Sequence, residues 1–136
     1  MCLYNEPGDV EKWLKKHGKK TKVRVWKMVE LSFTGNSLKG PYRSWFRYEK
    51  GINKSNCRQE KPSYYHDTID AGIHVYLDKD RAEQQAGDMK VRIVLSVWVK
   101  PSELLGVEGK TAVFKNMCIS ERIYKKALTG EHKVCI

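Results

Sequence analysis

The sequence predicts an α+β fold, a single domain built on a mixed, mostly antiparallel sheet of four to five strands with two or three short helices. Three observations lead to this prediction. The chain has 136 residues, the size of one domain with one core. Hydrophobic residues make up 40% of it and charged residues 31%, as in folded globular proteins. Segments that alternate apolar and polar side chains are interspersed with short segments that carry helix caps.

One domain is expected over residues 1–136, because no internal repeat, low-complexity tract or linker divides the chain. We divide it into an N-terminal helix and basic turn over 1–21, a sheet core over 22–124 and a tail over 125–136.

The first helix is predicted over residues 10–17. Asp9 is a good N-cap and Gly18 a good C′ residue, and Trp13 and Leu14 form the buried side.

A strand follows in VRVWKMVELSF, residues 23–33, where apolar side chains alternate and only Lys27 breaks the apolar face. Residues 34–62 are rich in Gly, Pro and polar side chains, which predicts loops with one short strand near Trp45 to Tyr48.

The segment IHVYL, residues 73–77, alternates in the same way and predicts a strand with one buried face. Asp78 then caps a helix that buries Ala82 and Ala86 and ends at Gly87.

The remaining elements are a central strand over 91–99, a short helical turn over 101–105 and a strand over 111–119. Ser120 is placed to cap a partly helical segment over 121–130.

The sequence contains no apolar stretch of the ~20 residues that span a bilayer and no N-terminal signal pattern, so we expect a cytoplasmic protein with no membrane partner. The cysteines do not form any C-x-x-C pair, so we expect free thiols and no metal site. They are Cys2, Cys57, Cys118 and Cys135.

The charge predicts an anionic partner. Lys and Arg number 26 against 16 Asp and Glu, a formal net charge of +10. Such an excess favours nucleic acid, a nucleotide, a membrane surface or an acidic protein, and does not choose among them. The excess is densest in EKWLKKHGKKTKVR, and we take five lysines there as a basic patch. They are Lys15, Lys16, Lys19, Lys20 and Lys22.

A candidate ligand site is centred on the strand 73–77. His74 and Tyr76 project from the same face, because side chains two apart in a strand point the same way. Arg and aromatic residues lie just upstream, and rings that stack on a base beside guanidinium groups that pair with phosphate suit a nucleotide. The candidate ligand-binding residues are Arg43, Trp45, Arg47, His74 and Tyr76.

Several segments occur in a recognisable order: VRVWKMVE at 23–30, GIHVYLDKDRAEQQAG at 72–87, VRIVLSVWVKPSELLG at 91–106 and GKTAVFKNMCISERI at 109–123. This order resembles the first strand, the strand-to-helix motif, the next core strand and the late strand of the ADP-ribosyltransferase superfamily. The resemblance covers about residues 22–124. It implies a nucleotide-binding scaffold, with NAD or ADP-ribose as the cofactor class.

In that family a Glu near the start of the late strand polarises the ribose hydroxyl. The resemblance therefore implies Glu108 as the catalytic candidate, with His74 or Tyr76 in support. The family's first-strand His is missing, and Arg24 or Trp26 stands in its place. Because of these departures, binding without turnover is at least as well supported as transfer.

The pieces MCLY, GPYRSWFRYEKG and AGIHVYL are also similar to small phage and mobile-element proteins that open with Met-Cys-Leu. This resemblance implies a phage or bacterial source and a role on host machinery. Removal of Met1 would place the thiol of Cys2 beside a free α-amine, which makes Cys2 a second catalytic candidate.

Three functions remain open. The first is a module that binds an anionic nucleotide-like or nucleic-acid ligand. The second is an active ADP-ribosyltransferase-like enzyme. The third is a phage-encoded inhibitor that docks onto a host protein through its basic face.

Overall fold

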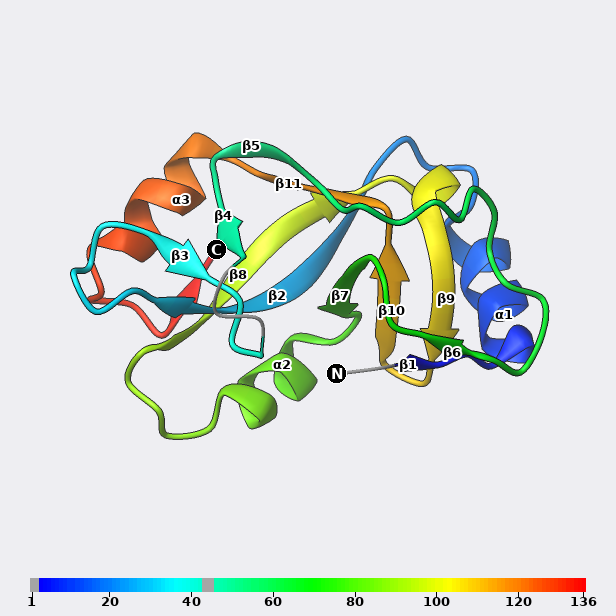
Figure 1. Cartoon of the computed structure of the whole chain (residues 1–136), viewed down its shortest axis with the longest axis horizontal. Helices are drawn as coiled ribbons and strands as arrows, with labels where there is room; N and C mark the ends of the chain where they lie inside the picture. The colour runs from blue at the N-terminus through cyan, green and yellow to red at the C-terminus, as the bar shows by residue number, and fades with distance from the viewer. Residues whose placement is uncertain (1–2, 43–45) are drawn as a thin grey trace.

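Two neighbouring strands, β2 (Val23–Leu31) and β8 (Arg92–Val99), form the centre of the fold, as the computed structural model in Figure 1 shows. The structure describes residues 3–42 and 46–136. The two strands pair antiparallel from Val23 opposite Val99 to Glu30 opposite Arg92. Their inward side chains are the alternating Val, Ile and Leu residues that predicted both strands.

The described residues form a sheet of ten strands, a second sheet of two strands and three α-helices. The large sheet runs in the order β5-β11-β8-β2-β7-β10-β9, and β3, β4 and β12 pair at its sides. The strands besides β2 and β8 are β3 (Leu38–Lys39), β4 (Arg47–Tyr48), β5 (Gly51–Lys54), β7 (Ile73–Tyr76), β9 (Leu104–Glu108), β10 (Thr111–Phe114), β11 (Asn116–Ile119) and β12 (Val134–Cys135). The small sheet pairs β1 (Leu3–Tyr4) with β6 (Thr68–Ile69).

The predicted fold class, with four or five strands, was wrong, because the protein is dominated by a larger sheet. Five strands of the two sheets, β1, β3, β4, β6 and β12, have only two residues each, too short for an alternating pattern to be visible. The strand expected over 111–119 is two strands that meet at Lys115. The helical turn expected through Leu105 ends at Glu103, and the buried strand β9 begins at Leu104.

Three helices cover the sheet (Figure 1). Helix α1 (Pro7–His17) packs on β9, α2 (Lys79–Ala86) on β2 and β8, and α3 (Glu121–Leu128) beside β8 and β12. The side chain of Asp78 caps α2 and that of Ser120 caps α3, each by accepting a backbone N–H of the first turn.

The strands close into a ring around the core. β2 pairs with β8 and β7, β8 with β11, and β10, which continues into β11, pairs with β7. Inward side chains from all of these strands belong to one buried cluster, with Phe114 fully buried in it. Two of the strand pairings in the ring consist of a single residue pair. Strand β7 pairs with β2 through Tyr76 and Trp26, and β11 pairs with β8 through Cys118 and Trp98.

The outer edge of β9 is covered by the backbone of Glu6 and Ser63, whose N–H groups donate to the carbonyls of Val107 and Leu105, and by one buried side chain. Asn5 is fully buried, its Oδ1 accepts the backbone N–H of Val107 at 3.0 Å, and its Nδ2 donates to the carbonyls of Ser63 (3.0 Å) and Tyr65 (2.8 Å). Three segments distant in sequence are therefore joined by one amide.

We expect Asn5→Ala to lower the free energy of unfolding by about 3 kcal/mol, because it leaves buried backbone groups without partners. Urea unfolding measures this change. The matched control is Asn36→Ala in the exposed turn after β2, where Asn36 accepts from Ser32 and Thr34, with an expected change below about 0.5 kcal/mol. Equal effects of the two substitutions would contradict the role of Asn5.

Candidate functional site

A gap in the hydrogen-bonding edge of β2 defines the candidate site. On the edge away from β8, β2 pairs with β7 at Trp26 and with β3 at Glu30 and Leu31. The residues between, Lys27 to Val29, form no backbone pair with either strand. A cavity opens at this gap, lined by Lys27 and Met28. We call it the Lys27 slot.

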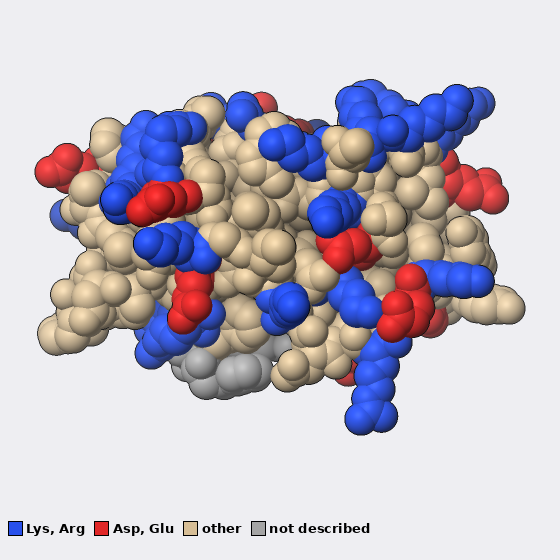
Figure 2. Space-filling model, turned by 90° about the horizontal axis from the view of Figure 1, so that it is seen from above, with Lys and Arg blue, Asp and Glu red and all other residues tan. Residues whose placement is uncertain are grey.

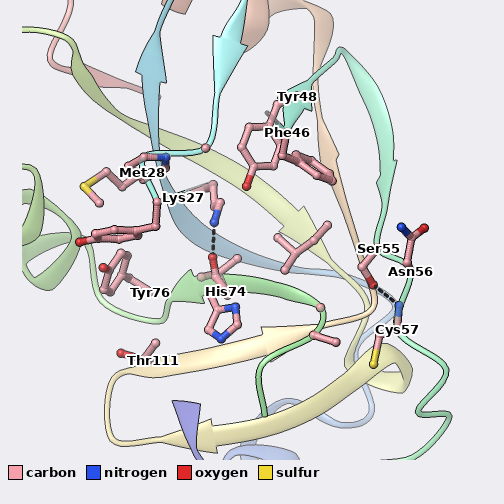
Figure 3. A pocket seen from close by; sticks show the side chains of 17 residues that line it. Lys27, Met28, Phe46, Tyr48, Ser55, Asn56, Cys57, His74, Tyr76 and Thr111 are labelled. Carbon is pink, nitrogen blue, oxygen red and sulfur yellow. Dashed lines mark hydrogen bonds between the residues drawn. The ribbon is translucent and has the colours of Figure 1, made fainter. Parts of the chain in front are cut away.

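The slot is lined by side chains from five segments far apart in sequence (Figure 3). Its lining residues are Lys27, Met28, Gly40, Pro41, Tyr42, Phe46, Tyr48, Ser55, Asn56, Cys57, Ala71, Gly72, Ile73, His74, Val75, Tyr76 and Thr111. Its volume is about 150 Å³. A void of that size takes a group as large as one benzene ring.

Lys27 is the one charged side chain on the core face of β2, between Val25 and Val29. It is only 8% exposed, and its Nζ donates to the carbonyl of His74 at 2.6 Å. The ammonium thus bridges β2 and β7 where their backbones have separated (Figure 3). It also lies 5.4 Å from the ring centroid of Tyr48, within the range of a cation–π interaction.

No carboxylate neutralises Lys27 within the described part of the chain. None of the ion pairs there includes it, and the described lining residues of the slot contain neither Asp nor Glu. An ammonium has three donors, and one of them is used by His74. A buried cation in this position favours an anionic group in the slot.

Strand β7 contributes His74 and Tyr76 to the slot from the face opposite Ile73 and Val75. Tyr76 is 5% exposed and packs against Met28 and the α2 residues Ala82 and Ala86. Its Oη has no hydrogen-bond partner among residues 3–42 and 46–136. A buried hydroxyl of this kind is a donor available to a ligand.

Burial raises the pKa of Tyr76, and the neighbouring Tyr42 raises it further, while Arg81 and Arg92 act in the opposite direction. The hydroxyl therefore keeps its proton at neutral pH and can donate it to an anion. Tyr42 is half exposed, with Arg92 at 5.8 Å from its ring centroid.

The side of the slot opposite His74 is aromatic. Phe46 and Tyr48 lie across Lys27 from His74 in Figure 3, with their ring centroids 4.9 Å apart. The end of the slot is polar, formed by Ser55 to Cys57, where Ser55 Oγ accepts the backbone N–H of Cys57 at 3.5 Å. An anionic group and an aromatic ring both find suitable surfaces here.

The predicted ligand residues fall in three places. His74 and Tyr76 line the slot together. Arg47 is exposed on β4, opposite Lys39, and does not line the slot. Arg43 and Trp45 lie outside the described residues.

The catalytic candidates are not in the slot. Glu108 is exposed at the end of β9, and its carboxylate accepts the backbone N–H of Tyr4 at 3.4 Å. The start of β10, where the resemblance implies a catalytic Glu, contributes Thr111 to the slot. Cys2 lies outside the described residues.

The five lysines of the basic patch are all exposed, in the last turn of α1 and the turn that leads to β2. They lie on other elements than those that form the slot.

Lys27 is the residue that the predicted site missed. Its signal was present, because it interrupts an otherwise apolar strand face, and a buried Lys needs a reason to be tolerated. The slot partners Tyr48 and Ser55 had no such signal, since Tyr48 ends a short predicted strand, Ser55 lies in a predicted loop, and neither residue stands out from its neighbours.

Comparison with protein-family models, with curated proteins and with solved structures finds no match to the chain. None of the helices formed by the described residues is long and apolar enough to cross a membrane. Within the same residues, no group of three or more His, Cys, Asp or Glu is placed to hold a metal ion.

We expect the Tyr76 environment to make the protein less stable at alkaline pH. The folded-state pKa of Tyr76 is raised, so from about pH 10 upward the unfolded chain loses this proton first and stability falls. Urea unfolding at pH 8 and pH 10.5 should show a smaller alkaline loss for Tyr76→Phe than for the unsubstituted protein. Tyr65→Phe, at a residue that is 78% exposed, is the control and should leave the loss unchanged. Equal alkaline loss in Tyr76→Phe and the unsubstituted protein would contradict the burial argument.

Proposed function

We propose that this chain binds a small nucleotide-like anion in the Lys27 slot and holds it without chemical turnover. The observation that carries the proposal is the buried Lys27 ammonium, which has no acidic partner among the described residues. Burying such a charge alone is costly, and an anionic ligand would offset that cost.

Two further features support an anionic group in the slot. The Tyr76 hydroxyl is buried, protonated and without a hydrogen-bond partner among the described residues, and Tyr76 lines the same slot as Lys27, so its hydroxyl is a further donor for a ligand there. The slot volume of about 150 Å³ suits a phosphate or a single ring and is too small for a whole dinucleotide. The ligand therefore enters with one end only.

The nucleobase of such a ligand would lie outside the slot, against Tyr42. Tyr42 lines the slot and is 51% exposed, so part of its side chain remains open to a ligand. A base that stacks on this ring while its phosphate reaches Lys27 would use both features. The net charge of +10 adds attraction for any such anion at long range.

Binding is favoured over ADP-ribosyl transfer by the composition of the slot. Transfer of the kind implied by the resemblance needs a carboxylate beside the ribose, and no Asp or Glu is found among the described lining residues. The protein therefore binds a nucleotide of the kind that ADP-ribosyltransferases use but does not transfer ADP-ribose. We place this binding in the cytoplasm, consistent with the free thiols of Cys57, Cys118 and Cys135.

We expect calorimetric titration to detect binding of AMP, and Lys27→Met to weaken it by about 10-fold to 100-fold through loss of a charge-assisted hydrogen bond. Lys54→Met, on the exposed edge strand β5, removes the same charge and should leave the affinity unchanged. Adenosine, which lacks the phosphate, should bind more weakly than AMP. Equal binding of AMP by the folded Lys27→Met variant and the unsubstituted protein would contradict the proposal, as would absence of binding.

Titration of NAD and ADP-ribose in the same calorimeter tests the alternative that the protein is an ADP-ribosyltransferase-like enzyme. Release of nicotinamide from NAD by the unsubstituted protein would overturn the proposal of binding without turnover. Intact NAD after prolonged incubation with the protein is the expected result.

A further inference from the structure

A second, shallower groove lies at the end of α1, apart from the Lys27 slot. It is bounded by Leu14 of α1 and Gly18 just after that helix, by Pro62 and Tyr64 of the loop before β6, and by Pro101 in the helical turn before β9. Its volume is about 530 Å³. We call it the lysine groove, because Lys20 and Lys100 line it.

No Asp or Glu among residues 3–42 and 46–136 forms an ion pair with the cations around this groove. Lys19, Lys20, Lys22 and Lys100 are all exposed, and none of them appears in an ion pair between described residues. Other surface lysines of the protein, such as Lys110 and Lys115, pair with carboxylates at 2.8 and 2.9 Å. The four lysines therefore give this surface a local positive charge that no ion pair between described residues reduces.

The positive charge at the end of α1 acts on a neighbouring side chain. His17, in the last turn of α1, has a pKa lowered by burial first and then by Lys20 and Lys16. Lys22 lies 4.3 Å from the ring centroid of Trp98, beside Arg24 at 5.2 Å. Figure 2 shows Lys and Arg side chains gathered at this end of the molecule.

Exposed aromatic rings accompany the charges. Tyr64, which lines the groove, is 57% exposed, and the adjacent Tyr65 is 78% exposed. A row of ammonium groups beside open aromatic rings is the arrangement by which proteins hold single-stranded nucleic acid, with phosphates on the cations and bases on the rings.

We infer that the lysine groove binds single-stranded nucleic acid, with Lys19, Lys20, Lys22 and Lys100 on phosphates and Tyr64 stacked on a base. A duplex would offer the phosphates but would keep its bases away from Tyr64. An acidic polypeptide would offer the charge but no base. Single-stranded nucleic acid uses both the lysines and the ring.

The test is fluorescence anisotropy of a labelled 12-nucleotide single-stranded DNA at several salt concentrations. Four phosphate contacts predict a slope of log K against log salt of about −3. Lys20→Ala with Lys100→Ala should reduce the magnitude of this slope by about 1.4, because two contacts are lost. The control pair Lys54→Ala with Lys90→Ala removes the same charge from exposed sites elsewhere and should leave the slope unchanged.

Tyr64→Ala separates stacking from charge attraction, and we expect it to weaken DNA binding by about 10-fold with the salt slope unchanged. Unchanged affinity in Tyr64→Ala, equal affinity for the matching duplex, or full displacement by an equal charge concentration of polyglutamate would each overturn the inference. Equal effects of the two lysine pairs would overturn it as well.

Lys27→Met keeps this inference separate from the proposed function. We expect it to leave DNA binding unchanged while it weakens AMP binding. Loss of DNA binding in the folded Lys27→Met variant would place the nucleic acid in the Lys27 slot. It would contradict the inference that the lysine groove binds it.

Discussion

The hydrogen bond from Lys27 Nζ to the carbonyl of His74 is the interaction on which the candidate site depends. Strand β7 leaves β2 after a single paired residue, and the ammonium spans the resulting gap. A backbone ladder in its place would close the sheet and fill the slot. The slot thus exists because two strands of one ring separate and one charged side chain, rather than backbone, connects them.

The charge that bridges the strands also determines the chemistry of the slot. Lys27 stands among the apolar side chains of the core, while Tyr76 adds a buried hydroxyl that keeps its proton. The ammonium donates one hydrogen bond, the hydroxyl is a donor without a partner among the described residues, and the aromatic side of the slot offers a surface to a ring. The uncompensated lysines at the end of α1 lie on a separate surface and act at longer range. One protein therefore presents a shallow positive surface and a small buried cationic site.

Part of this arrangement could be predicted from the sequence. The alternation in residues 23–31 and 92–99 identifies β2 and β8, and Asp78 and Ser120 mark two helix starts. Strand parity alone puts His74 and Tyr76 on one face. The two-residue strands could not be predicted, because their pairing depends on tertiary contacts and not on local pattern. For the same reason the meeting of Lys27 with Tyr48 and Ser55 is not visible in the sequence, although Lys27 itself stands out as a charge on an apolar face.

The most direct test of the account is a ¹H–¹⁵N NMR spectrum of the lysine ammonium groups, recorded with and without AMP. Exposed ammonium protons exchange rapidly with water, so a buried, hydrogen-bonded Lys27 should give a resolved signal that is absent in Lys27→Met. We expect AMP to shift this signal in proportion to the bound fraction. A Lys27 signal that stays in place at saturating AMP would show that the ammonium between β2 and β7 does not receive the ligand.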